Sequence, residues 1–221
     1  MGRLRTAVLI SGRGSNLSAL IDEFSSPDAP AEIVLVVSNI RDAPGIDLAR
    51  KAGLAYEIID HLDFTKREDF EEKLNLTLIK NNVDFICLAG FMRILTGDFT
   101  KIWQDRLINI HPSLLPAYPG LRTHERAIAD GVKFSGCTVH FVREKMDVGP
   151  IIVQAAVPIR QEDTPDSLAS KILSEEHKCL TYALAQIARG NVSVHGNKVR
   201  INKSEGPICA VINPSIARSE K

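Results

Sequence analysis

The strongest constraint on the fold is an alternation of short apolar runs with helical segments along the first ninety residues. The runs at residues 6–10, 33–37, 56–59 and 85–89 have the length and apolar character of buried parallel strands. Between them, apolar residues recur at helical spacing in residues 17–24, 43–52 and 65–80. In the last segment the expected buried stripe is Phe70, Leu74, Leu78 and Ile79. This order predicts a doubly wound, mostly parallel α/β sheet with right-handed crossovers. Because such sheets bind ligands at the carboxyl ends of their strands, we expect the site in loops 11–16, 89–96 and 109–121.

The second half of the chain departs from this alternation. A strand is expected at residues 107–110, and two β-rich runs at 137–142 and 151–157 flank a turn-like stretch. They predict an antiparallel hairpin added to the parallel sheet. A long helix is expected at 166–188 and a small hairpin at 192–201 around Gly196-Asn197. The 221 residues contain no long linker, which indicates one domain, and residues 206–221 are expected to form a flexible tail.

Composition excludes several classes of protein. Lys+Arg and Asp+Glu both total 27, so the chain lacks the basic excess of a typical nucleic-acid-binding protein. The four cysteines are at least about thirty residues apart, which excludes CxxC metal pairs and fits buried thiols in a reducing compartment. The apolar stretch near the N-terminus covers only residues 7–10, too short for a signal peptide or a membrane span. We therefore expect a cytoplasmic protein.

A glycine-rich loop, Ser-Gly-Arg-Gly-Ser-Asn at residues 11–16, lies between the first expected strand and the first helix. Glycines allow the backbone to approach a ligand, and the N–H groups at a helix start favour an anion. The third glycine of a dinucleotide motif and an acidic residue after the second strand are missing, so the loop favours a phosphate monoester. The same residues also fit a tight turn in which Ser15 or Asn16 caps the helix.

The strongest chemical signal is the pair Asn109 and His111, two residues apart on an expected strand. On an extended strand these side chains share one face, while Ile108 and Ile110 lie on the opposite, apolar face. A histidine exchanges protons near neutral pH, and an asparagine amide can hydrogen-bond a developing oxyanion. Asp147, in the turn of the expected hairpin, is the candidate carboxylate that would stabilise a charged imidazole.

Each of these residues also has a purely structural interpretation. A histidine at a strand end commonly serves the core, and an aspartate shortly before Gly149-Pro150 commonly forms a turn. The other histidines, His140 among them, have no comparable local context. The sequence contains no His-Glu-x-x-His motif, no Cys–His cluster and no Gly-x-Ser-x-Gly motif, so we expect neither a metal site nor a serine nucleophile.

Taken together, five segments resemble the folate-dependent phosphoribosylglycinamide formyltransferases of purine synthesis. They are AVLISGRGSNLSALI from Ala7, LAGFMRIL from Leu88, NIHPSLLPAYPGLRTHERAI from Asn109, GCTVHFVREKMDVGPII from Gly136 and SEEHK from Ser174. The resemblance implies a Rossmann-like formyltransferase fold. It also implies direct transfer of the formyl group of 10-formyltetrahydrofolate to the amine of 5-phosphoribosylglycinamide through a tetrahedral intermediate, with His111 as general acid and base. A water held near Asp147 is the alternative carrier of the proton.

The resemblance also assigns residues to roles. The implied catalytic residues are Asn109, His111 and Asp147. The implied ribonucleotide site comprises Gly14, Ser15, Asn16, Leu173, Ser174, Glu175 and Glu176. The implied folate site comprises Arg67, Met92, Arg93, Ile94, Leu95, Asn109, Arg143, Glu144, Lys145, Met146 and Asp147. A single formyltransferase domain at 1–205 would then have a phosphate-binding half at about 1–100 and a folate-binding, catalytic half at about 101–190.

The implied partners are small molecules, with no metal, nucleic acid or membrane, and a monomer or homodimer is expected. Related enzymes that formylate methionyl-tRNA or hydrolyse formyltetrahydrofolate share the Asn-x-His pair and a distant aspartate. They carry further domains that we expect this chain to lack. Two alternatives remain: a formyltetrahydrofolate hydrolase or a formyltransferase to another acceptor, and a non-catalytic module that binds a phosphorylated metabolite. The second would need the glycine loop but not the Asn-His-Asp trio.

Overall fold

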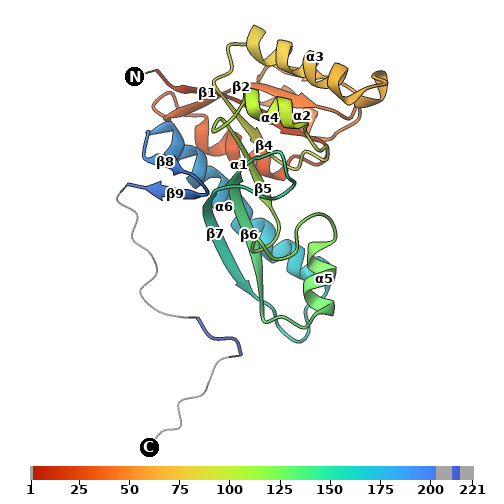
Figure 1. Cartoon of the computed structure of the whole chain (residues 1–221), viewed down its shortest axis with the longest axis vertical. Helices are drawn as coiled ribbons and strands as arrows, with labels where there is room; N and C mark the ends of the chain where they lie inside the picture. The colour runs from red at the N-terminus through yellow and green to blue at the C-terminus, as the bar shows by residue number, and fades with distance from the viewer. Residues whose placement is uncertain (1, 203–210, 215–221) are drawn as a thin grey trace, which may run out of the picture.

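The computed structural model describes residues 2–202 and 211–214, which form one nine-stranded mixed sheet (Figure 1). The strands are β1 (Leu4–Ile10), β2 (Ala31–Ser38), β3 (Tyr56–Ile58), β4 (Phe85–Leu88), β5 (Leu107–His111), β6 (Phe134–Phe141), β7 (Ile151–Pro158), β8 (Val192–His195) and β9 (Lys198–Ile201). Their order across the sheet is β3-β2-β1-β4-β5-β6-β7-β9-β8. Strands β1 to β5 pair in parallel, which confirms the doubly wound arrangement expected for the first half.

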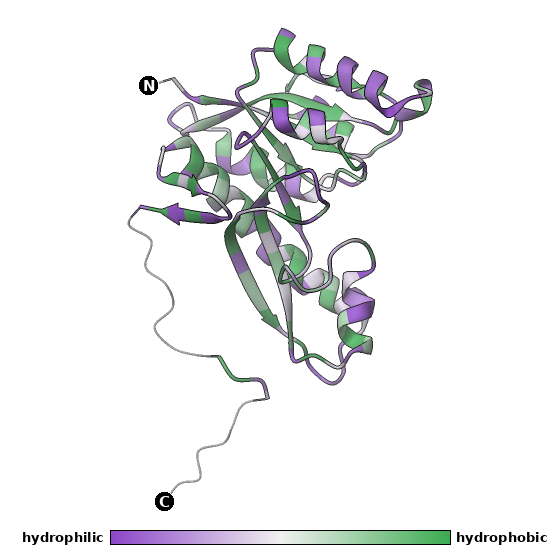
Figure 2. Ribbon diagram, viewed as in Figure 1, coloured by the Kyte–Doolittle hydropathy of each residue, from purple (hydrophilic) through white to green (hydrophobic). Residues whose placement is uncertain are grey.

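Helices cover both faces of this sheet. They are α1 (Ser15–Phe24), α2 (Gly45–Lys51), α3 (Arg67–Lys80), α4 (Gly97–Ile102), α5 (Thr123–Ala129) and α6 (Pro165–Ala188), with a short 3-10 helix η1 (His61–Asp63). Buried residues of α1, α2 and α6 share one core with Val8 and Ile10 of β1. Those of α3 and α4 share the other core with Ala7 and Leu9. Because Ala7, Val8, Leu9 and Ile10 alternate between the two cores, this part of β1 is an unbroken apolar run. The ribbon of the central strands is largely in the hydrophobic colour (Figure 2). Within the described residues, no helix combines the length and apolar character needed to cross a bilayer.

The second half contains the expected hairpins. Strand β6 pairs antiparallel with both β5 and β7, so the predicted hairpin extends the parallel sheet from its β5 edge. Strands β8 and β9 form the small antiparallel hairpin, and β9 lies beside β7. Most of the predicted flexible tail, residues 206–221, lies outside the described residues. In the described part of it, Asn213 donates to the carbonyls of Lys133 and Ile159, which anchors that stretch to the domain.

Three local expectations differ from the structure. Helices α4 and α5, of six and seven residues, occur where no helix was predicted, because so few residues show little periodicity. The side chain of Thr96 accepts from the Phe99 amide and so caps α4. Ile79 was expected in the buried stripe of α3 but is 58% exposed. The stripe keeps a four-residue spacing through Leu74 and Leu78, and Ile79 is rotated by about 100° from Leu78 toward solvent.

Candidate active site

Strand β5 presents Asn109 and His111 on the face opposite Ile108 and Ile110. The two isoleucines are buried in the core beneath α1 and α6, as expected from alternation along the strand. Asn109 is half-buried, and His111 is only 6% exposed. A polar pair is therefore held at the end of a rigid central strand, where its geometry changes little.

Asp147 lies beside His111, although 36 positions separate them in the chain. Its Oδ1 atom is 3.5 Å from Nδ1 of His111, and both side chains are nearly buried. Its Oδ2 atom accepts a 2.7 Å hydrogen bond from the Gly120 amide. The backbone of Asp147 has φ of 53°, a left-handed conformation that Asp and Asn tolerate better than most residues. The structure thus brings together the three residues that the sequence singled out for catalysis.

The contacts of His111 determine which of its nitrogens can exchange a proton. Nε2 lies 2.9 Å from the carbonyl oxygen of Tyr118. A carbonyl only accepts, so Nε2 carries a proton and donates it to that bond. Nδ1 is left facing the Asp147 carboxylate, which stabilises a positive charge on the ring.

His140, which the sequence analysis set aside, is the register partner of Asn109 on β6. Its Nδ1 lies 3.1 Å from the Phe141 carbonyl, so Nε2 is the accepting nitrogen. Burial lowers the pKa of His140, which keeps the ring neutral near pH 7. Its Nε2 lies 3.4 Å from Nδ2 of Asn109 and orients that amide. One N–H of Asn109 remains for a ligand. No local sequence pattern could indicate this contact, because it depends on the pairing of β5 with β6.

The glycine loop begins α1 at Gly14, whose φ is 78°. A Cβ on Gly14 would lie 2.8 Å from Cα of Gly45, so only glycine fits this close backbone approach. No side chain in the described part of the chain caps α1, so neither Ser15 nor Asn16 plays the capping role considered above. The first turn of the helix therefore keeps its N–H groups available for an anion.

Asn16 is 7% exposed and donates a 2.8 Å hydrogen bond to Oε2 of Glu176 on α6. Its Oδ1 atom is buried without a hydrogen-bond partner among the described residues. An unpaired buried acceptor is costly, so this atom points to a ligand that supplies a donor.

Burial raises the pKa of Glu176, and the hydrogen bond from Asn16 and the charges of His177 and His111 offset only part of that rise. Glu176 thus joins α6 to the glycine loop through Asn16. Two neighbours of Glu176 in the SEEHK segment face elsewhere, because Ser174 and Glu175 line a different cavity together with Arg160 and Lys171. Of the residues expected on α6, the structure brings only Glu176 into hydrogen-bond contact with the glycine loop.

The loop after β4 is tied to the glycine loop through Ser11. The Ser11 hydroxyl accepts a 2.7 Å hydrogen bond from the Met92 amide and donates to Oδ1 of Asn39. The Met92 and Ile94 side chains are exposed, and Leu95 is buried. The guanidinium of Arg93 lies 5.7 Å from the ring centroid of Phe70. Phe70 is in α3, about one helical turn after Arg67.

A model of the formyl transferase family matches residues 4–184. The chain belongs to this family. The phosphoribosylglycinamide formyltransferase of Escherichia coli K12 is 39% identical over 194 residues, covering 88% of this chain and 92% of that protein. The human trifunctional purine biosynthetic protein adenosine-3 is 45% identical over 195 residues, 88% of this chain but only 19% of that protein. The crystal structure of glycinamide ribonucleotide transformylase 1 from Symbiobacterium toebii shares 42% identity and a TM-score of 0.87, covering 90% of this chain and 94% of that one.

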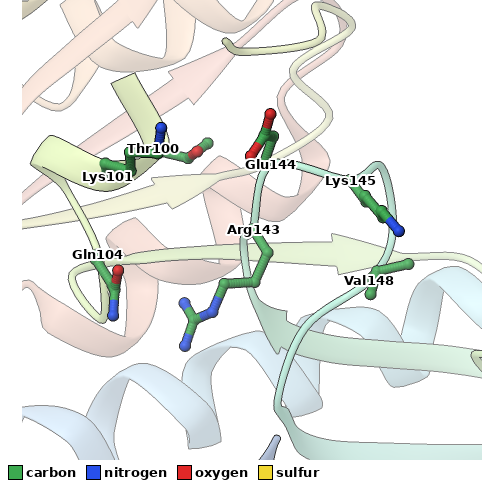
Figure 3. Close-up of a pocket in the computed structure, with 7 residues that line it drawn as sticks. All are labelled: Thr100, Lys101, Gln104, Arg143, Glu144, Lys145 and Val148. Atoms are coloured by element: carbon green, nitrogen blue, oxygen red, sulfur yellow. The ribbon is translucent and has the colours of Figure 1, made fainter. Parts of the chain in front are cut away.

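The loop after β6 places its expected folate residues in two different surroundings. Arg143, Glu144, Lys145 and Val148 line a cavity of about 290 Å³ against Thr100, Lys101 and Gln104 (Figure 3). Arg143 also forms a 2.6 Å ion pair with Asp105. Met146 and Asp147 instead approach Gly120. Of this loop's expected folate residues, only Met146 and Asp147 are therefore near the turn at Gly120.

Two exposed apolar side chains, Met92 and Met146, belong to loops that meet near α4. The Glu144 side chain packs against Gly97 at the start of this helix, directly after the loop that carries Met92. Exposed apolar side chains on such loops fit a flat, partly apolar ligand. Within residues 2–202 and 211–214, no three His, Cys, Asp or Glu side chains are grouped so that they could hold a metal ion.

Proposed function

We propose that this chain transfers the formyl group of 10-formyltetrahydrofolate to the amine of 5-phosphoribosylglycinamide, a step of purine biosynthesis. The observation that carries the proposal is the meeting of Asn109, His111 and Asp147 at the carboxyl end of β5. The Escherichia coli relative that bears this name aligns over nearly the full length of both proteins. We also propose that the protein acts in the cytoplasm on small molecules, as a monomer or homodimer.

The acceptor side of the site is the glycine loop with Asn16 and Glu176. The N–H groups of the first turn of α1, at Gly14, Ser15 and Asn16, suit a phosphate group. The unpaired Oδ1 of Asn16 and the carboxylate of Glu176 suit the hydroxyl donors of a ribose. A phosphorylated ribose would therefore lie between the loop and α6, with its amine directed toward His111.

The donor side is formed by the loop after β4 and the loop after β6. Met92, Ile94 and Met146 supply exposed apolar surface, and backbone groups of the same loops would offer hydrogen bonds to a pterin. Arg67 and Arg93, near the start of α3, would attract the carboxylates of the folate glutamate. This arrangement would place the formyl group between Asn109 and the incoming amine.

The chemistry follows from the trio. The free N–H of Asn109 would stabilise the oxyanion formed when the amine attacks the formyl carbon. Nδ1 of His111 would accept a proton from the attacking amine and return one to the folate nitrogen. Asp147 would stabilise the imidazolium that exists between these two transfers. The formyl carbon gains one bond to nitrogen and loses one, so the transfer needs no oxidant or reductant.

The test is to mix the purified protein with 10-formyltetrahydrofolate and follow tetrahydrofolate production spectrophotometrically, with and without 5-phosphoribosylglycinamide. We expect deformylation that depends on the ribonucleotide and that is lost in His111→Ala. Position 195, an exposed histidine on β8, offers the matched control His195→Ala, which should keep full activity. Near-normal turnover by His111→Ala would contradict the assignment of the trio.

The remaining outcomes separate the alternatives. Deformylation without any acceptor would identify a formyltetrahydrofolate hydrolase. Binding of the ribonucleotide without turnover under any condition would favour a non-catalytic module that recognises the phosphorylated ribose through the glycine loop.

A further inference from the structure

Arg126, on α5, contacts the backbone turn at residues 118–121 through two hydrogen bonds and one cation–π contact. Its Nη1 atom donates to the carbonyl of Pro119 at 2.6 Å and to that of Leu121 at 3.3 Å. Its guanidinium carbon lies 5.4 Å from the ring centroid of Tyr118. The planar guanidinium of arginine is better suited than any other side chain to donate charge-assisted hydrogen bonds to two carbonyls while it stacks over an aromatic ring.

Backbone groups of this turn form hydrogen bonds with two members of the proposed catalytic trio. The Tyr118 carbonyl accepts from Nε2 of His111, and two residues later the Gly120 amide donates to Asp147. These two groups set the orientation of the imidazole and of the carboxylate that faces it. A shift of the turn would therefore alter the contact between Nδ1 of His111 and Asp147.

The turn contains one unfavourable backbone conformation and is held from both sides. Tyr118 has φ of 54°, which is uncommon for a residue with a side chain, whereas Gly120 adopts its φ of 77° at little cost because it has no Cβ. On the N-terminal side, the Ser113 hydroxyl donates to the Ala117 carbonyl and holds the chain at that point. On the C-terminal side, the Arg126 guanidinium supplies the corresponding anchor.

We propose that Arg126 is a positioning residue for the catalytic centre, acting through the backbone of residues 118–121. It touches neither His111 nor Asp147, and its effect passes through the Tyr118 carbonyl and the Gly120 amide. The inference rests on the proposed function in so far as His111 and Asp147 are taken to be the groups that move protons. Because the Arg126 side chain is exposed, its removal should leave global stability nearly unchanged.

The experiment compares three variants in the transfer assay. Arg126→Met removes the donors and the charge while keeping an unbranched side chain over Tyr118. Arg126→Lys keeps the charge and a single donor. Arg122→Met is the matched control, because Arg122 is an exposed arginine four residues earlier whose ion pair is with Glu125. We expect Arg126→Met to lower kcat by about tenfold, since small misplacements of reacting groups are costly.

Three further readings separate positioning from a structural or binding role. The KM for each substrate should stay within about threefold of wild type in Arg126→Met, and its unfolding midpoint should match that of Arg122→Met. Arg126→Lys should recover part of the lost kcat. Unchanged kcat in Arg126→Met would overturn the proposal. So would a large rise in the KM for one substrate at constant kcat, which would make Arg126 a binding residue.

A readout that does not depend on turnover keeps the inference distinct from the proposed function. In protein labelled with ¹⁵N-histidine, the Nε2–H proton of His111 should be protected from exchange with water by its bond to Tyr118. His111→Gln identifies the signal. We expect faster exchange in Arg126→Met and no change in Arg122→Met. If wild type lacks transferase activity but this difference is seen, the proposed function fails and the positioning role stands. If the exchange rates are equal, the positioning role fails.

Discussion

Replacement of Asp147 by asparagine removes one negative charge from the proposed catalytic trio and little else. Asparagine has the same shape, tolerates the left-handed backbone at this position, and its side-chain oxygen can still accept from Gly120. The variant should therefore fold with a free energy of unfolding close to that of wild type. What it loses is the attraction between the carboxylate and a charged His111.

The size of this loss follows from the geometry. The atoms are 3.5 Å apart, and the two side chains are 7% and 10% exposed, so bulk water screens them poorly. Two unit charges at that distance attract by about 5 kcal/mol at an effective dielectric constant of about 20. Desolvation cancels part of this, and the asparagine dipole retains some, so we take roughly half, about 2.5 kcal/mol. That corresponds to a loss of about 70-fold in kcat.

The assay is steady-state turnover with both substrates varied, beside Asp47→Asn as a control for the same chemical change. Asp47 is an exposed residue of α2 that pairs with Arg50, far along the chain from the trio. We expect kcat to fall about 70-fold in Asp147→Asn with each KM within about threefold, and no change in Asp47→Asn. A kcat within threefold of wild type in Asp147→Asn would refute the view that a charged imidazole forms opposite this carboxylate.

Three further predictions concern other parts of the molecule. In urea titrations, Gly14→Ala should lower the free energy of unfolding by about 2 kcal/mol more than Gly53→Ala. Both glycines have positive φ, but only a Cβ on Gly14 would lie 2.8 Å from Cα of Gly45. Equal losses in the two variants would argue against the clash. Asn16→Leu should raise the KM for the ribonucleotide at least about tenfold with a smaller change in the KM for formylfolate; the reverse order would move the phosphate site elsewhere. Hydrogen bonds, the largest from Lys171, lower the pKa of Asp163 to about 2, so its stabilisation is present above pH 4 and disappears as the pH falls toward 2. Urea titrations of wild type and Asp163→Asn should therefore differ at pH 6 and converge near pH 2, whereas a difference that persists at pH 2 would point to a cause other than ionisation.

Much of the fold could be predicted because the deciding information is local. A parallel strand buried on both faces is apolar along most of its length, so the centres of β1, β2 and β4 are visible as short apolar runs separated by helical periodicity. Alternation along β5 places Asn109 and His111 on one face whatever surrounds the strand. The glycine loop is equally local, because a strand followed at once by a helix requires a tight turn.

What the sequence by itself determined was thus the type of sheet, the shared face of Asn109 and His111, and a backbone turn at Gly14 suited to an anion. Only the tertiary structure decided which distant groups meet them. His140 lies beside Asn109 through the register of β5 and β6, and Glu176 reaches Asn16 across 160 positions. The Tyr118 carbonyl that orients His111 is a backbone atom, which every residue type possesses and no sequence pattern can distinguish. These contacts depend on how loops close and strands pair over long separations, whereas periodicity reports only on neighbours within one element.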